Sequence, residues 1–192
     1  ISVYYFWNYL YKLIKSANDV LKTTVDDSKK EERGQALGMR AFAYLTLVQM
    51  YQHTYSGHEN DPAVPIVLET TEPDVLSNNP RASVQAVYDQ IEKDLLQAHG
   101  DLAEFQRLNI TYINQSVISG LLARMYLLKE DWFNAAKYAR EARASYGSPA
   151  DKAELIDEGY IDMNKHHTWM FASHLTTDAE VVQTGIINFI SH

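Results

Sequence analysis

Histidine and carboxylate side chains are the first candidates for chemistry, because both bind metals and transfer protons. The histidines gather in two stretches. They are His53 and His58, with Glu59 and Asp61, in one stretch, and His166, His167 and His174 in the other. Neither stretch has the helical i, i+4 spacing of a zinc enzyme, and no HExxH motif occurs. The sequence therefore predicts exposed polar histidines, with no metal and no cofactor.

Groups for catalysis are not evident in the sequence either. Cysteine is absent, and neither a nucleophile elbow nor a glycine-rich phosphate loop occurs. A glycoside hydrolase would need two carboxyl groups about 5–10 Å apart in a cleft, and the acidic residues are instead spread along predicted helix faces. We expect a protein that is not an enzyme, and a glycoside hydrolase is the remote alternative.

Aromatic side chains offer a different chemistry, since their faces can stack on the apolar faces of sugar rings. The first eleven residues contain Tyr4, Tyr5, Trp7, Tyr9 and Tyr11. Trp7 falls on the apolar face of a predicted helix and is expected in the core, whereas Tyr4 and Tyr11 project differently and are candidate ligand contacts. Tyr55 is a third candidate, because connecting segments on rigid scaffolds often carry function.

Two arginines occupy equivalent places in helices rich in alanine and tyrosine. Arg40 and Arg124 could bind a ligand as a pair of cations, or each could be partly buried beside a carboxylate, because an unpaired buried charge is strongly unfavourable. Asp94, close to the apolar Leu96, is the best partner by pattern. We expect a structural role for these charges, and we expect Asn18 to bond with backbone rather than with a ligand.

Apolar residues at spacings of three and four predict helices along much of the chain. The first runs from about residue 3 to residue 23. The second is expected to start at a capping box of Ser28 and Glu31 and to end near Tyr51. Ser83 is predicted to cap a third helix, and Asn114 or Ser116 to start a fourth.

Residues 120–142, GLLARMYLLKEDWFNAAKYAREA, read as two helices joined by a turn at 129–131. Small and aromatic residues alternate at the spacing of a tetratricopeptide hairpin: Ala123, Tyr126, Trp132, Ala135 and Ala142. Alanines let antiparallel helices approach closely, while the large aromatics are expected to fill the wedge beside them. The sequence thus predicts an all-α fold of tetratricopeptide-like hairpins.

The expected organisation is one helical-repeat domain over residues 1–192, as part of a longer chain. Residues 1–52 form a first hairpin, 53–80 a loop with at most a short edge strand, 81–147 further helices, and 148–192 an irregular extension. The loop holds four of the five prolines, and a loop of this length usually packs over something or binds something.

Composition speaks against some classes of binding partner and against a membrane span. The net charge of −8 speaks against nucleic acid, whose phosphates require a basic surface. No run approaches the ~20 apolar residues of a membrane span. The first residues lack the features of a signal peptide, so we expect a mature protein or a piece of one.

Several ordered segments together resemble the SusD/RagB family of bacterial surface glycan-binding lipoproteins. They are residues 7–14 (WNYLYKLI) with 17–18, 34 with 39–44 (MRAFAY), 47–51, 80–84 with 87–88, 91–95, 121–127 and 132–136. Residues 168–172 and 189–192 are similar to the family's middle region. Family members are two to three times longer, so the resemblance implies a fragment without the lipidated N-terminal cysteine.

The resemblance implies an outer-membrane lipoprotein that binds oligosaccharides without cleaving them and covers a TonB-dependent SusC-like transporter. The family's usual Tyr-Gly-Asp-x-Pro reads YQHTY at residues 51–55 here, which leaves room for a ligand other than a common glycan. The alternative is a generic helical-repeat module that binds a protein or peptide and has no sugar ligand.

Overall fold

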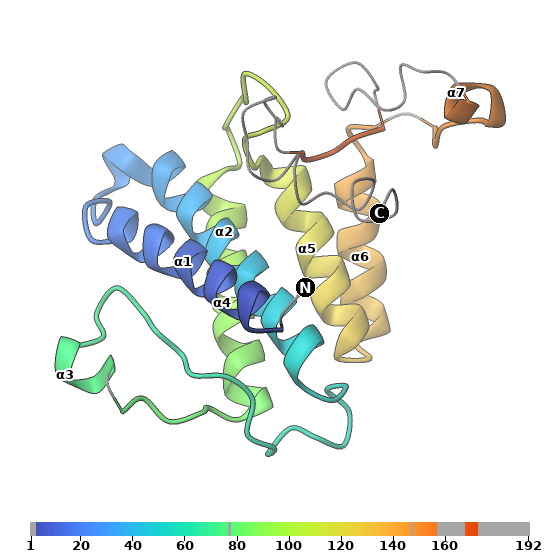
Figure 1. Ribbon diagram of the computed structural model, residues 1–192. Coiled ribbons are helices and arrows are strands. Elements are labelled where there is room, and N and C mark those ends of the chain that lie inside the picture. Colours follow the sequence, from blue (N-terminus) through green and yellow to red (C-terminus); the bar gives the residue numbers. More distant parts are fainter. Residues whose placement is uncertain (1–2, 77, 147, 157–167, 173–192) are drawn as a thin grey trace, which may run out of the picture. The chain divides into compact units, whose positions relative to one another are not determined.

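The computed structural model describes residues 3–76, 78–146, 148–156 and 168–172. The described residues contain helices and no strand, which confirms the all-α prediction. In chain order the elements are α1 (Val3–Leu21), the short 3-10 helix η1 (Asp27–Lys29), α2 (Lys30–Tyr51), α3 (Pro73–Leu76), α4 (Val84–Asp101), α5 (Gln115–Leu128), α6 (Trp132–Arg143) and α7 (Lys152–Ile156) (Figure 1).

The chain divides into two compact units. One comprises Ile1–Arg107 and Ile113–Tyr146 and holds α1 to α6; the other comprises Leu108–Tyr112 and Gly147–His192. Within the second unit, the backbone N–H of Ala172 donates to the carbonyl of Ile110 at 3.1 Å. The candidate sites described below all lie in the first unit.

Helices of the first unit pack in a series: α1 on α2, α2 on α4, α4 on α5, and α5 on α6. Figure 1 shows α5 and α6 side by side, as predicted for the hairpin at residues 120–142. Helix α2 is buried on two sides because α1 and α4 both cover it. Gly34 permits a close approach there, since an added Cβ would lie 2.6 Å from Cγ of the fully buried Leu102.

Side-chain caps explain where several helices begin. The Ser83 hydroxyl accepts from the N–H of Ala86, which confirms the predicted cap. Of the two predicted starts of the next helix, Asn114 is the cap, because its side-chain Oδ1 accepts from the N–H of Val117. The predicted capping box is wrong, because Ser28 lies inside η1 and Asp26 accepts from its N–H instead. The carboxylate of Asp26 is a stronger acceptor than a hydroxyl and lies two residues before Ser28, at the N-cap of η1.

The long segment between α2 and α4 has little regular structure. Pro62 and Ser83 form an isolated antiparallel bridge, and α3 provides a single helical turn. Its attachment to the helices comes mainly from side chains that bond its backbone, as detailed below. No helix in the described ranges is both long enough and apolar enough to span a membrane.

Candidate ligand-contact surfaces

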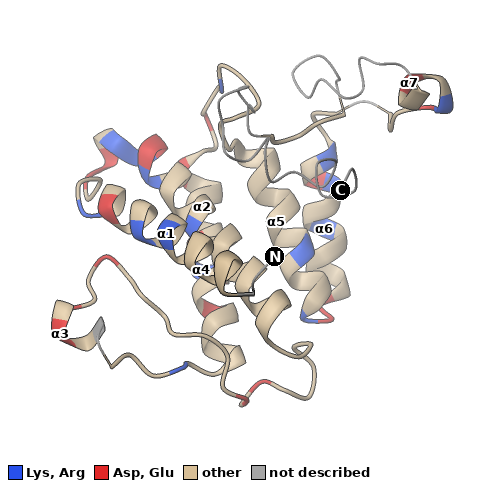
Figure 2. Ribbon diagram, in the orientation of Figure 1, with Lys and Arg blue, Asp and Glu red and all other residues tan. Residues whose placement is uncertain are grey.

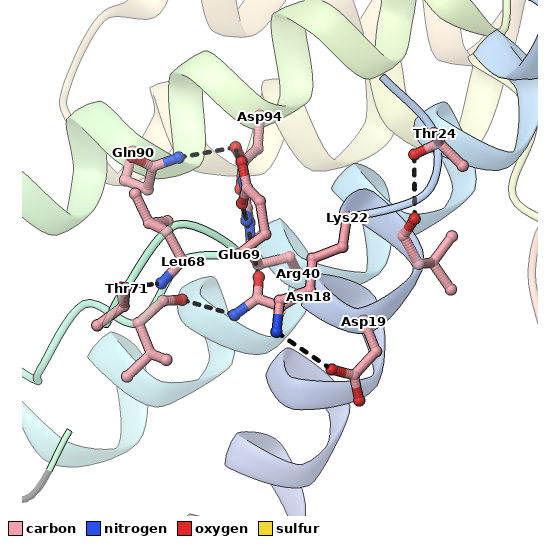
Figure 3. Close-up of polar contacts among 12 residues, drawn as sticks. Asn18, Asp19, Lys22, Thr24, Arg40, Leu68, Glu69, Thr71, Gln90 and Asp94 are labelled. Carbon is pink, nitrogen blue, oxygen red and sulfur yellow. Dashed lines mark hydrogen bonds and ion pairs between the residues drawn. The ribbon is translucent and has the colours of Figure 1, made fainter. Parts of the chain in front are cut away.

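A buried polar group joins three helices and the long loop. We call it the Arg40 cluster; its members are Asn18 of α1, Arg40 of α2, Asp94 of α4 and Glu69 of the loop (Figure 3). Arg40 donates from Nε to Asp94 Oδ2 at 2.7 Å and from Nη2 to Asp94 Oδ1 at 2.8 Å. Its Nη1 donates to Asn18 Oδ1 at 2.8 Å and to a carboxylate oxygen of Glu69. One guanidinium thus links all four segments.

Burial and charge oppose each other in the Arg40 cluster. The side chains of Arg40 and Asp94 are only 4% and 2% exposed, whereas Glu69 is 31% exposed. Burial raises the pKa of Asp94, against the hydrogen bonds from Arg40 and Gln90. Burial is the largest single influence on Glu69 and acts to raise its pKa, but the hydrogen bond and charge of Arg40, a backbone hydrogen bond and the charge of Lys93 together hold that pKa below its usual value. Glu69 is therefore a charged acceptor at neutral pH.

Residues 65–67 of the loop are fixed by side chains from α1 and α2. The Tyr44 hydroxyl accepts from the N–H of Val67 at 2.7 Å and donates to its carbonyl at 3.0 Å. Asn18 Nδ2 donates to the same carbonyl at 3.0 Å. The Tyr11 hydroxyl donates to the carbonyl of Pro65 at 2.7 Å. These bonds replace the strand pairing that the loop lacks and hold it against the scaffold.

A cavity of about 250 Å³ lies beside the Arg40 cluster. The end of α1, α2, α4 and loop residues Leu68 and Glu69 form its walls. Figure 3 shows Leu68 and Glu69 of the loop facing Gln90 and Asp94 of α4. Aliphatic and polar side chains line it together, so the cavity offers both apolar contact and hydrogen bonds.

Tyr55 lies in a second group of aromatic and charged side chains. Its ring meets that of Tyr88 edge-on, 4.8 Å between centroids, and its hydroxyl donates to Gln85 Oε1. Lys129 Nζ lies 5.7 Å from the Tyr55 ring centroid and donates to Glu92 at 2.7 Å. Tyr55 is therefore half-buried and held in place, with part of its ring facing solvent.

Tyr4 and Tyr11, the other two predicted ligand contacts, have different surroundings. Tyr4 is 72% exposed, in a stretch of α1 without charged residues (Figure 2). Tyr11 is half-buried, and its hydroxyl donates to the loop carbonyl of Pro65, so less of it is open to a ligand than of Tyr4. Trp7 is half-buried as well, with ring centroids of Tyr11 and Tyr51 each 5.0 Å away.

Arg124 differs from Arg40 in spite of its equivalent place in the sequence. Arg40 is buried and pairs with Asp94, the partner suggested by the pattern. Arg124 is exposed, and its Nη2 donates to Gln49 Oε1 at 2.8 Å. The expectation of a buried carboxylate pair at Arg124 is therefore corrected: α4 covers α2 around Arg40, whereas Arg124 lies on the open side of α5.

An apolar groove runs between α5 and α6. It has a volume of about 380 Å³, and its lining includes Ala123, Leu127, Trp132, Ala135 and Ala139. Trp132 is 62% exposed and lies at the edge of the groove. The prediction that it fills the wedge between the helices is therefore wrong. As the first residue of α6, directly after its cap Asp131, it lies where the two helices are joined.

The two histidines of the long loop stack on each other, and one of them bonds an acid. The rings of His53 and His58 stack at 4.8 Å, and His58 Nδ1 lies 2.7 Å from Asp61 Oδ2. Within the part of the chain that the structure describes, no three His, Asp or Glu side chains come together as a metal site would require. His166, His167 and His174 lie outside the described residues.

Sequence reasoning missed Glu69, Tyr44 and Gln90 as members of this polar region. Glu69 stands in a loop where no periodicity predicts its neighbours. Tyr44 is fully buried in α2, where apolar spacing accounts for its ring but says nothing of its hydroxyl. Gln90 lies four residues before Asp94 in α4, a spacing that places both on one face and could have indicated the bond at 2.8 Å.

A series of helical hairpins that carries one long anchored loop defines a helical-repeat scaffold protein. Residues 2–127 match the family described as SusD-like, "Starch-binding associating with outer membrane". The chain belongs to this SusD-like family.

Solved structures agree with this assignment. A SusD-like carbohydrate-binding protein from Bacteroides vulgatus is 26% identical, with a TM-score of 0.79 over 90% of this chain and 37% of its own. A SusD superfamily protein from Bacteroides thetaiotaomicron is 23% identical, with a TM-score of 0.66 over 75% of this chain and 33% of its own. A laminarin-binding SusD-like protein is 24% identical, with a TM-score of 0.61 over 76% of this chain and 31% of its own.

The second and third of these likenesses show the fold alone. The chain spans about a third of the length of all three structures. No curated protein matches the sequence.

Proposed function

We propose that the protein binds oligosaccharide or polysaccharide without cleaving it. The observation that carries this proposal is the family match over residues 2–127, joined to the 26% identity with a SusD-like carbohydrate-binding protein. The laminarin-binding protein of the same fold adds a polysaccharide to test. Tyr55 and the exposed Tyr4 are the proposed contacts, with Tyr11 a weaker candidate because its hydroxyl is occupied.

Binding to starch and to laminarin in native affinity gels tests this proposal. We expect retarded migration in at least one of the two polysaccharides. Tyr55→Ala or Tyr4→Ala should weaken retention by about 2- to 10-fold, the value of one aromatic stacking contact. Phe133→Ala on α6 is the matched control, since Phe133 is 78% exposed and outside the proposed contacts. Unchanged migration in both polysaccharides would contradict the proposal.

The place of action that we propose is the outer surface of the bacterial outer membrane, with a lipid anchor in the full-length protein. The family description associates its members with the outer membrane. The partner would be a TonB-dependent SusC-like transporter that receives the bound glycan. Affinity purification of the tagged full-length protein from membranes should recover such a transporter in near-equal amount, and its absence would contradict the partnership.

A helical-repeat module for protein binding is the second candidate function. The apolar groove between α5 and α6 favours it, because exposed apolar surface of this kind often marks a contact with another protein segment. The two functions separate in the affinity gels, since a protein-binding module would migrate unchanged in every polysaccharide.

A further inference from the structure

The cavity beside the Arg40 cluster is lined by apolar and polar side chains together. Leu21, Leu37 and Leu68 contribute aliphatic surface, while Glu69, Lys93 and Gln97 contribute a carboxylate, an ammonium and an amide. Lys93 and Gln97 are exposed and Glu69 is half-buried, so donors and acceptors line one space that is open to solvent.

Several of these polar groups keep hydrogen-bonding capacity. Among the described residues, the side chains of Lys93 and Gln97 have no hydrogen-bond partner, although the charge of Lys93 acts on Glu69. Glu69 accepts from Arg40 with one oxygen, and an ionised carboxylate has about four acceptor positions in all. The cavity can therefore donate from Lys93 and Gln97 and accept at Glu69 and Gln97.

The rigid side of the cavity is the Arg40 cluster. Arg40 and Asp94 are held by two parallel hydrogen bonds in a nearly solvent-free position. Arg40 in turn fixes the carboxylate of Glu69, and Asn18 links Arg40 to the backbone of Val67. A ligand would thus meet an acceptor that is already oriented, which reduces the entropy lost on binding.

Size and chemistry select the ligand class. A volume of about 250 Å³ lies below the ~300–1,000 Å³ of sites that take larger ligands, so the cavity admits one ring and not a chain. Sugar hydroxyls both donate and accept, which suits a carboxylate, an ammonium and an amide side by side, and ring C–H groups suit the leucines. We propose that the cavity is a subsite for one sugar ring of the bound glycan. Glu69, Lys93 and Gln97 bond its hydroxyls, and Arg40 is the positioning residue for Glu69.

This subsite rests on the proposed glycan function, and D-glucose, the monomer of starch, is the probe that tests it. In amide-resolved NMR spectra, titration with glucose should shift the side-chain amide signals of Gln90 and Gln97 and the backbone signals of Leu68 and Glu69. Sorbitol, which carries similar hydroxyls on an open chain, should cause much smaller shifts. Equal shifts with sorbitol would overturn the assignment to a ring.

Variants of exposed residues separate binding from folding. Lys93→Ala and Gln97→Ala should each weaken glucose binding by about 2- to 10-fold, the value of one hydrogen bond, and Lys12→Ala on α1 should not. Glu69→Gln keeps the size of the side chain and should weaken binding as well, while thermal unfolding stays within a few degrees of the unchanged protein.

Two negative results have different meanings. Retention on starch or laminarin without glucose-induced shifts at the cavity would overturn the subsite and leave the proposed function intact. No interaction with any carbohydrate would overturn the proposed function and the subsite together.

Discussion

At the scale of single residues, Arg40 shows how a buried charge can be tolerated. Removal of a guanidinium from water is costly, and only near-complete hydrogen bonding offsets that cost. Arg40 meets this requirement through Asp94, Asn18 and Glu69, and burial would otherwise lower its pKa. The cluster gains specificity as well as stability, because a single rotamer of Arg40 joins four segments of the chain.

Truncation of Arg40 should be strongly destabilising. Arg40→Ala leaves the carboxylate of Asp94 buried without its cation, and we expect a loss of about 3–5 kcal/mol in the free energy of unfolding, measured by urea denaturation. Arg124→Ala, at an exposed position, should change stability by no more than about 0.5 kcal/mol. Equal losses in the two variants would contradict the structural role of Arg40.

The stability lost in Arg40→Ala should also depend on pH. Without Arg40, the pKa of Asp94 rises further, because burial already raises it and the opposing cation is gone. The folded variant then binds a proton more tightly than the unfolded chain, so its stability rises as the pH falls. The difference between Arg40→Ala and the unchanged protein should therefore be smaller at pH 5 than at pH 8.

At the scale of elements, local rules predict the helices well and their connections poorly. Ser83 and Asn114 cap α4 and α5 as expected, because a cap depends only on its own residue and the next three. Ser28 does not cap α2, because it lies inside η1 and both its N–H and its hydroxyl donate to the carboxylate of Asp26. The path of residues 62–71 depends on Tyr44, Asn18 and Arg40, which lie 20 to 50 positions away in sequence, so no local pattern encodes it.

The turn between α5 and α6 contains a residue in an unfavourable backbone conformation. Residues 129–131 contain no glycine, yet Glu130 has a φ of +62°, in the left-handed region that glycine adopts without strain. The N–H of Asp131 bonds the carbonyl of Tyr126 at 2.9 Å, an arrangement typical of a helix C-terminus. The short connection therefore imposes the conformation, and Glu130 adopts it.

Glycine at position 130 should stabilise the hairpin. Glu130→Gly removes the steric cost of the left-handed conformation, and we expect a gain of about 0.5–1 kcal/mol in the free energy of unfolding. Ala136→Gly in the interior of α6 is the control, with an expected loss of about 1 kcal/mol from helix propensity. A loss in both variants would show that the Glu130 side chain contributes more than its backbone costs.

At the scale of the whole molecule, the acidic net charge and the neutral proposed ligand together predict how binding depends on salt. A net charge of −8 repels polyanions, whereas a neutral glycan feels no long-range force from it. The hydrogen bonds and stacking contacts proposed above act at short range, where salt screens little. Retention on starch should therefore change by less than about 2-fold between 0.05 and 0.5 M NaCl, as measured in affinity gels. Heparin, a strongly sulfated polysaccharide, should not bind at either salt concentration. Binding to heparin that weakens steeply with salt would instead place the ligand contact on a local basic surface and contradict recognition of a neutral sugar.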